Sequence, residues 1–269
     1  MRANEAMEAV DRARGLATAV REAGALALSL FGTSLKQWTK GASSPVSEAD
    51  IAVDKLLRER LTAIDPGIAW LSEESIDDPI RLDARLVWIV DPIDGTRGYI
   101  AGMPDWAVSA ALVEDGRPVV ACLFAPVTSE FFMAVAGQGA TRNDNPIRAT
   151  AGGELMDIRV AGPKNFLERV SKIAPAFTVI PRVHSLALRL ARVADGSIDA
   201  AVAGGNSHDW DLAAADLLVH EAGGTLTPLG GGFLTYNRAV PRHGMLVAAG
   251  RDRHTALINL LNDPRLATT

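Results

Sequence analysis

A chain of 269 residues, 48% hydrophobic and 22% charged, can bury a substantial core, which excludes a fragment or a disulfide-stapled miniprotein. Its formal net charge of −5 and sequence pI of about 5.6 give no overall attraction to nucleic acid or to an anionic membrane, so any phosphate must be held locally. The one cysteine, Cys122, excludes an internal disulfide and fits a reducing compartment.

The first quarter of the sequence predicts a helical layer. Apolar residues recur at helical spacing from Glu5 to Leu30, and Ser47 can cap a second amphipathic helix that ends near Ile64. The N-terminal stretch MRANEAMEAVDRARGLATAV mixes acidic and basic residues, unlike a signal peptide. No window approaches the ~18 to 20 apolar residues of a membrane span. We therefore expect a cytoplasmic protein with neither a membrane nor a nucleic acid polymer as partner.

The segments after the second helix predict a sheet with mostly antiparallel connections. Strands are expected in GIAWLSEE, in ARLVWIVDP and, in succession, from Trp106 to Val135. EDGR carries the Asp-Gly hairpin signal, and GQGATRNDNPI is a second turn-rich hairpin. The apolar run RLVWIV is typical of a strand buried on both faces, and Pro92 is expected to end it.

The second half of the sequence alternates strands with helices. Strands are expected near Ile158 to Ala161, in IDAAVAG and near Met245 to Ala249. Helices are expected after GPKN, from Ser185 to Ala194, in WDLAAADLLVHEAGG and at the C-terminus. No linker separates independent domains, so we expect one unit over 1–269, with an antiparallel-rich half over about 1–150 and an α/β half over about 151–269.

The stretch VDPIDGTRGY places two carboxylates at one corner of the chain. Asp91 follows the buried strand, Gly95 permits a tight turn, and GTRGYIAG can begin a short helix whose N-terminal amides form an anion site. Taken alone, the stretch is equally well explained as turn chemistry. Asp91 and Asp94 would repel an anion bound at this site. A cation between the two carboxylates and the anion would remove that repulsion.

Carboxylates at similar corners favour the cation. Glu73 and Glu74 follow the apolar strand IAWL, and Asp211 lies in the first turn of a helix, where by itself it would be read as a helix-dipole partner. With Asp91 and Asp94 these residues give an oxygen-rich ligand set without cysteine or a histidine pair. Such a set suits Mg²⁺ or Mn²⁺ better than zinc. The five histidines are expected to be structural or on the surface.

Four motifs, in order, resemble the inositol monophosphatase family of metal-dependent, lithium-sensitive phosphatases. They are SPVSEAD, SEES, WIVDPIDGTRGYIAG and WDLAAADLLVHEAGG. The resemblance covers nearly the whole chain. It implies a layered α/β sandwich of alternating helix and sheet layers, like that of fructose-1,6-bisphosphatase, with the active site between the two halves. It also implies a homodimer.

Carried over motif by motif, the resemblance implies a site for two or three Mg²⁺ ions. Glu73, Asp91 and the carbonyl of Ile93 would hold one ion, and Asp91, Asp94 and Asp211 would hold a second. Glu73 would also reach toward a third, weaker ion. Two closely spaced Mg²⁺ ions stabilise the attacking and leaving oxygens of an in-line displacement at phosphorus.

The resemblance also implies the catalytic roles. Glu73 and Thr96 would position and deprotonate the attacking water, and Asp50 would accept the Thr96 hydroxyl proton. Without the motif, Asp50 would be read as a helix cap. The amides of Gly95 and Thr96 would cradle the phosphate. Lys40 lies where the family has a mobile metal-binding loop, although a solvated surface lysine is an equally good reading.

The expected substrate is a small phosphomonoester of the inositol-1-phosphate type, but one position departs from the family. Members that act on inositol phosphates carry a glutamate seven residues before the second-motif aspartate, where this chain has Gly204. Asn206, His208 or their neighbours are expected to supply replacement polar contacts. In HSLALRL, His184 stands where the family often has glycine, and Ser185 is expected to contact the substrate. From these departures we expect a pocket for the leaving group that differs in shape from that of the family members that act on inositol phosphates.

Several alternatives stay open. SPVSEAD is similar to the 3'(2'),5'-bisphosphate nucleotidase branch, which acts on 3'-phosphoadenosine 5'-phosphate, whereas DGTRGYIAG is similar to inositol-phosphate and histidinol-phosphate phosphatases. A non-catalytic metal- and phosphate-binding protein is disfavoured, because it would not need both Asp50 and Thr96. A glycosidase with paired carboxylates is disfavoured by the anion site, by the number of acidic ligands and by an aromatic content of only 5%.

Overall fold

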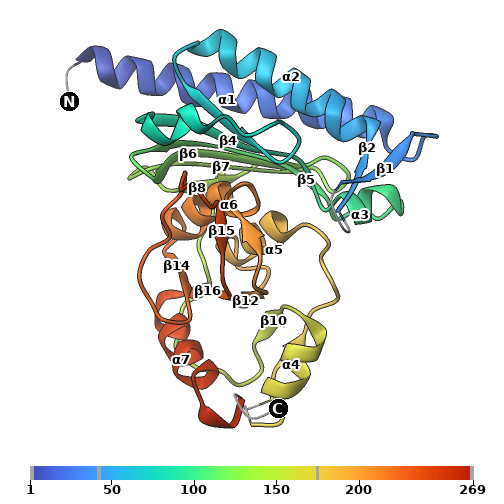
Figure 1. Ribbon diagram of the computed structural model, residues 1–269. Coiled ribbons are helices and arrows are strands. Elements are labelled where there is room, and N and C mark those ends of the chain that lie inside the picture. Colours follow the sequence, from blue (N-terminus) through green and yellow to red (C-terminus); the bar gives the residue numbers. More distant parts are fainter. Residues whose placement is uncertain (1–2, 41–43, 174–175, 267–269) are drawn as a thin grey trace.

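The chain folds into alternating layers of helix and sheet (Figure 1). The structure is a computed structural model that describes residues 3–40, 44–173 and 176–266. Helices α1 (Ala3–Leu30) and α2 (Glu48–Ile64) cover the outer face of a seven-stranded sheet. The middle layer holds α5 (Leu186–Ala194) and α6 (Asp209–Glu221), followed by a five-stranded sheet and by α4 (Lys164–Val170) and α7 (Arg251–Leu261). The expected layered α/β sandwich is confirmed.

The seven-stranded sheet is antiparallel except at one edge, as predicted. Its first strand, β3, pairs in parallel with β4, and every later neighbour is antiparallel. Two of its turns have positive φ at both central residues, Asp115 and Gly116 in one and Asn143 and Asp144 in the other, which suits two-residue hairpins. The strands are β3 (Ala69–Ser72), β4 (Leu86–Asp94), β5 (Ala107–Glu114), β6 (Arg117–Ala125), β7 (Glu130–Val135), β8 (Ala140–Arg142) and β9 (Asn145–Pro146).

Strand β4 continues past Pro92, and the expectation that this proline ends the strand is wrong. Asp91 pairs with Ser109 and Asp94 pairs with Ala107, so β4 has one more residue than β5 between these two pairs. The resulting bulge accommodates a proline that has no N–H for the ladder. In a regular strand, residues three apart point to opposite faces. The extra residue therefore lets the side chains of Asp91 and Asp94 turn to the same side.

The five-stranded sheet begins after residue 158 and contains two strands that the sequence analysis did not predict, β11 and β14. Its order is β11-β10-β12-β16-β14, with parallel pairing only on the two sides of β10. The strands are β10 (Arg159–Ala161), β11 (Thr178–Val179), β12 (Ala200–Ala203), β14 (Gly224–Pro228) and β16 (Leu246–Gly250). Smaller elements are β1 (Gln37–Lys40), β2 (Ser44–Ser47), α3 (Thr96–Ile100), β13 (Ser207–His208), β15 (Arg242–His243), and short 3₁₀ helices at Pro79–Asp83 and Pro264–Leu266.

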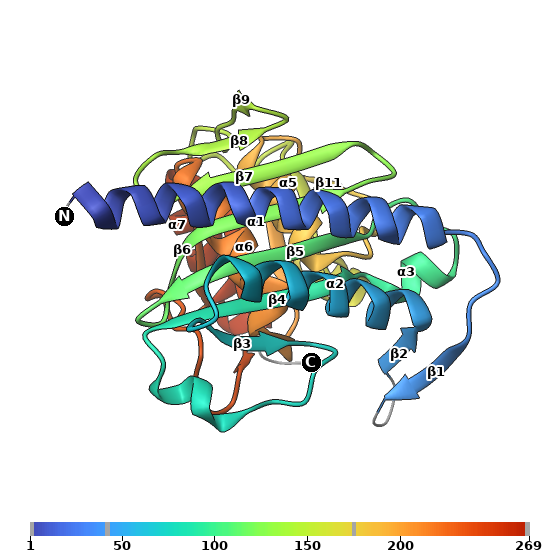
Figure 2. The same cartoon turned by 90° about the horizontal axis from the view of Figure 1, so that it is seen from above.

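Buried apolar side chains fill the spaces between the layers. Strand β4 contributes to two of them, because Val87 and Ile89 face the middle helices whereas Trp88 and Val90 face α1 and α2. Burial on both faces explains its continuous apolar run, as predicted. Seen from above, α1 and α2 run side by side across this sheet (Figure 2). Among the described residues, no helix is long and apolar enough to cross a membrane.

The chain segment that connects the two sheets is hydrogen-bonded to the start of α7. We expect Gly250→Ala to destabilise the protein at this contact. The side chain of Arg253 donates hydrogen bonds to the Thr150 hydroxyl (2.7 Å) and the Ala151 carbonyl (2.9 Å). A Cβ at Gly250 would overlap the carbonyl oxygen of Thr150, so backbone must move. The free energy of unfolding should fall by about 1 to 3 kcal/mol.

The matched control for this prediction is Gly244→Ala, where an added Cβ meets open space. That change should be neutral or slightly stabilising, because alanine lowers the entropy of the unfolded chain. Denaturant unfolding of both variants measures the difference. A Gly250→Ala protein as stable as the wild type would contradict this description of the packing.

Candidate functional site

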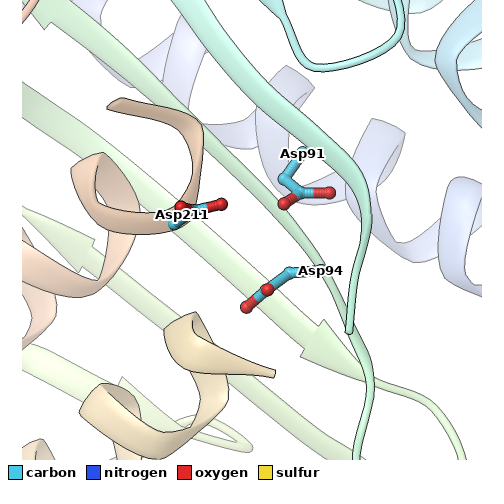
Figure 3. Close-up of side chains that lie close together, drawn as sticks. All are labelled: Asp91, Asp94 and Asp211. Atoms are coloured by element: carbon cyan, nitrogen blue, oxygen red, sulfur yellow. The ribbon is translucent and has the colours of Figure 1, made fainter. Parts of the chain in front are cut away.

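Three aspartates converge where β4 ends. Asp91 and Asp94 come from β4, and Asp211 comes from the first turn of α6. One carboxylate oxygen of each lies within 4.8 Å of the other two. Figure 3 shows the three carboxylates facing a common space. Like charges at this spacing repel one another in a buried site, so the arrangement calls for a positive charge between them.

Asp91 carries the strongest signal for a bound cation. It is 1% exposed, and neither of its carboxylate oxygens has a hydrogen-bond partner among the described residues. Burial raises the pKa of Asp91 well above its ordinary value, and the charges of Glu73 and Asp94 raise it further. A buried carboxylate without a partner is costly. Because the surrounding donors are all oxygen atoms, the residues fit Mg²⁺.

Helix N-termini fix the other two aspartates. Asp94 Oδ2 accepts hydrogen bonds from the Ser185 hydroxyl and the Ala187 N–H, both at 2.6 Å, at the start of α5. Asp211 Oδ2 accepts from the His208 N–H (2.7 Å) at the start of α6. Both carboxylates are thus held in place by hydrogen bonds and by the positive ends of helix dipoles. Ser185 is fully buried and donates to Asp94, and its expected substrate contact stays a prediction.

Asp50 and Thr96 are joined by a hydrogen bond. The Thr96 hydroxyl lies 3.0 Å from Asp50 Oδ1 and 3.0 Å from the carbonyl oxygen of Ile93. Asp50 Oδ2 accepts from the N–H (2.9 Å) and the hydroxyl (2.6 Å) of Ser47, at the start of α2. Asp50 therefore caps α2 with one oxygen and accepts the hydrogen bond of Thr96 with the other. Its interpretation as a helix cap and its interpretation as the partner of Thr96 are compatible.

Glu73 lies directly after β3, next to the end of β4. Burial raises its pKa to about 7, against the opposing charge of Lys40. Lys40 Nζ donates to the carbonyl oxygen of Glu73 (2.8 Å) and lies 2.7 Å from Glu74 Oε1. Lys40 therefore links the β1–β2 hairpin to the end of β3 through a hydrogen bond and an ion pair, and it is not simply a solvated surface lysine. The loop between these strands, 41–43, lies outside the described residues.

A cavity of about 190 Å³ opens onto these side chains. Gly95 has a φ of 93°, and a Cβ there would lie 2.9 Å from the Ser185 nitrogen, so glycine is needed for both conformation and space. Thr96 begins α3, so backbone amides are available to an anion. The lining residues are Pro45, Glu73, Asp91, Asp94, Gly95, Thr96, Arg97, Arg182, His184 and Asp211.

Arg97 and Arg182 were not predicted as site residues from the sequence. Arg97 follows Thr96 directly, and a cation next to a predicted anion site was a signal that could have found it. Arg182 precedes α5, and nothing local marks it as a site residue. His184, from the same segment, has Nδ1 2.8 Å from Asp105 Oδ2. Arg97, Arg182 and His184 thus lie beside the three aspartates. A phosphate could be bound there by the arginines on one side and by metal ions on the other.

Asn206 and His208 do not line this cavity. The Asn206 N–H donates to the His243 carbonyl oxygen (3.0 Å) in the turn before β13. The ring of His208 stacks on Trp210, and its Nε2 accepts a hydrogen bond from Arg242 (3.1 Å). The substrate contacts expected of these two residues stay a prediction, with both residues outside the lining of this cavity. What His208 contributes is its backbone N–H, which orients Asp211.

A family model and several similar proteins indicate one family. The model of the inositol monophosphatase family matches residues 8–264. An inositol-1-monophosphatase from Rhizobium meliloti is 36% identical over 72% of this chain and 75% of its own length. A 3'(2'),5'-bisphosphate nucleotidase CysQ from Aggregatibacter actinomycetemcomitans is 32% identical over 74% and 77%. The crystal structure of the extragenic suppressor protein suhB from Bartonella henselae superposes with a TM-score of 0.83 and 30% identity, covering 93% of this chain and 98% of that one.

The raised pKa of Glu73 leads us to expect that the free energy of unfolding depends on pH. The ordinary pKa of Glu73 is 4.5 and its pKa in the folded protein is about 7, so between these values the folded chain binds more protons than the unfolded chain. The stability contributed by protonated Glu73 is therefore full below pH 4.5 and is lost as the pH rises to about 7. Mg²⁺ favours the ionised carboxylates, so its stabilising effect should grow across the same window.

Thermal unfolding with Mg²⁺ and with EDTA, in unit steps from about pH 5 to about pH 8, measures this effect. The increase in Tm caused by Mg²⁺ should be larger at the upper end of the series. An increase of the same size at every pH would show that these carboxylates do not bind the ion.

Proposed function

This chain belongs to the inositol monophosphatase family of metal-dependent phosphatases, and on that premise we propose that it hydrolyses a small phosphomonoester with Mg²⁺ as its cofactor. One observation carries the proposal: Asp91 is a buried carboxylate without a partner among the described residues, beside two further aspartates. Structural carboxylates in ordinary cores are paired or hydrogen-bonded. A site that leaves one unpaired is built to receive a cation.

The residues divide between two ion positions. Glu73, Asp91 and the Ile93 carbonyl would hold one Mg²⁺, and Asp91, Asp94 and Asp211 would hold a second. Bound ions neutralise the phosphate dianion and lower the pKa of water near them. Glu73 would also bind a third, weaker ion.

The protein's own groups would position the reactants. With its proton directed to Asp50, the Thr96 hydroxyl keeps a lone pair for a hydrogen bond from the attacking water. The Glu73 carboxylate takes a proton from that water while the water oxygen forms a bond to phosphorus. The P–O ester bond then breaks, the leaving oxygen takes up a proton from solvent water, and the products are an alcohol and inorganic phosphate. The amides of Gly95 and Thr96 hold the non-bridging phosphate oxygens.

The substrates to compare are inositol-1-phosphate, 3'-phosphoadenosine 5'-phosphate and histidinol phosphate. The similar curated proteins include inositol-1-monophosphatases and 3'(2'),5'-bisphosphate nucleotidases, so a nucleotide substrate is the second candidate. Arg97 and Arg182 at the cavity favour a substrate that carries an anionic group in addition to the phosphate that is hydrolysed. Lithium sensitivity and a homodimer stay predictions from the family, and a cytoplasmic location stays a prediction from the sequence.

The first test is phosphate release from these three substrates with Mg²⁺ and with EDTA, in the wild type and in Asp91→Asn. Release should require Mg²⁺, and the variant should lose about 100-fold or more in kcat, because a ligand shared by two ions is gone. The metal-free variant should unfold at a higher temperature than the metal-free wild type, because an unpartnered buried charge is removed. Asp115→Asn, in an exposed hairpin turn, is the charge-matched control.

Near-normal kcat in Asp91→Asn would refute the metal site. Release that continues in EDTA would refute the cofactor assignment. Mg²⁺ binding measured by calorimetry, with no release from any substrate, would favour the non-catalytic binding protein.

A second test separates the Thr96 hydroxyl from its methyl group. Thr96→Val keeps the shape but removes the hydrogen bond to Asp50, and should lower kcat about 100-fold. Thr96→Ser keeps the hydroxyl and should retain most of the activity. Steady-state kinetics that place Thr96→Ser no better than Thr96→Val would exclude the proposed positioning of water.

A further inference from the structure

One histidine lies in the wall of the cavity that the three aspartates share. His184 belongs to the segment just before α5, whereas the aspartates come from β4 and α6, and its ring lines the same space of about 190 Å³. A space of this size holds only a few water molecules, so a group bound there lies close to every wall. A phosphate ester in this cavity would therefore bring its ester oxygen close to the His184 ring.

The carboxylate of Asp105 fixes the orientation of that ring. Asp105 lies between α3 and β5 and is 9% exposed, and His184 Nδ1 lies 2.8 Å from its Oδ2 and 3.0 Å from its Oδ1. The same carboxylate accepts the backbone N–H of His184, and the Asp105 carbonyl oxygen accepts the N–H of Ser185 (3.0 Å). An ionised carboxylate can only accept, so Nδ1 carries a hydrogen. The other ring nitrogen, Nε2, is left for a further partner.

Helix α3 encloses the same side of the ring. A Cβ at Gly98 would lie 2.8 Å from both Cβ and Cγ of His184 and 3.3 Å from its Nδ1, so the ring packs against the backbone of α3 where only a glycine leaves room. The Nδ1 side of the ring is thus held between α3 and Asp105. The edge that carries Nε2 is therefore the part of the ring that lines the cavity.

The proposed reaction has a use for a proton donor at this place. An alkoxide is a poor leaving group, and a positioned acid that protonates it as the P–O bond breaks lowers the barrier. A carboxylate on Nδ1 favours the ring that is protonated on both nitrogens, and the negative charge of a bound phosphate favours it further. The other charged groups that line the cavity are Glu73, Asp91, Asp94, Asp211, Arg97 and Arg182. Bound Mg²⁺ would offset these carboxylates, which leaves Asp105 as the acid group that acts directly on His184.

We propose that His184 is a catalytic residue that donates its Nε2 proton to the leaving oxygen of the substrate, and that Asp105 is its positioning residue. The inference rests on the proposed phosphatase function. As the P–O bond breaks, its electron pair stays on the leaving oxygen, which bonds to the proton, and the N–H electron pair stays on Nε2. The ring becomes neutral and takes up a proton from solvent water, while Glu73 releases to solvent the proton of the attacking water. The alcohol and inorganic phosphate are then the only products.

The test varies the need of the leaving group for a proton. Inositol-1-phosphate, 3'-phosphoadenosine 5'-phosphate and histidinol phosphate are all esters of aliphatic alcohols, whereas 4-nitrophenyl phosphate releases a phenolate that is stable without a proton. His184→Gln keeps a polar side chain beside Asp105. It should lower kcat for the best aliphatic ester about 100-fold and change kcat for 4-nitrophenyl phosphate by less than about 3-fold. Asp105→Asn should shift the same ratio in the same direction, by about 10-fold, because it removes the charge that favours the protonated ring.

The matched control is His220→Gln. His220 also pairs with an aspartate, with Nε2 3.1 Å from Asp216 Oδ1, but it lies near the end of α6 and does not line the cavity. This control should leave both kcat values close to wild type.

Equal losses on both kinds of ester in His184→Gln would overturn the inference, because a residue that only binds phosphate or supports the fold affects both alike. No loss on either would also overturn it. In both cases Mg²⁺-dependent release by the wild type would leave the phosphatase function standing. Absence of release by the wild type from every ester would refute that function, and the proton transfer with it.

Discussion

A carboxylate that the protein itself does not pair organises the centre of this molecule. Asp91 is buried at the end of β4 with no hydrogen-bond partner among the described residues, and Asp94 and Asp211 add their charges to the same space. The first turns of α5 and α6 donate backbone hydrogen bonds to these two neighbours but not to Asp91. The helix termini therefore orient the ligand set without neutralising it, which leaves the central charge for a cation.

The layered fold tolerates this concentration of charge because the site lies at the ends of its elements. Apolar cores on both sides of the seven-stranded sheet stabilise β4 over most of its length, and only its last residues carry the carboxylates. The middle helices α5 and α6 pack between the two sheets and present their N-termini to the same point. Rigid elements thus hold the ligands in place before any ion arrives, which is what preorganised electrostatic catalysis requires.

The sequence by itself determined most of the helices and strands and the residue types from which the site is built. Helical periodicity, the apolar run of β4 and the Asp-Gly turn at Asp115 are local patterns, and local patterns fix local structure. Carboxylates next to strand ends and helix starts, at Asp91, Asp94 and Asp211, could be proposed as ligands because those positions meet at the edges of packed layers. Four ordered motifs then indicated the family, which the comparisons confirm over residues 8–264.

Only the tertiary structure decided how these pieces meet. Strand β4 passes through Pro92 in a bulge, because its pairing with β5 outweighs the preference of proline to end a strand. The packing of α5 directs the Ser185 hydroxyl to Asp94, and no local pattern encodes that choice. Arg182 reaches the cavity from a distant part of the chain. Sequence patterns define which residue types are available, but contacts between remote segments depend on how the layers pack, so the walls of the cavity beside the three aspartates could be known only from the fold.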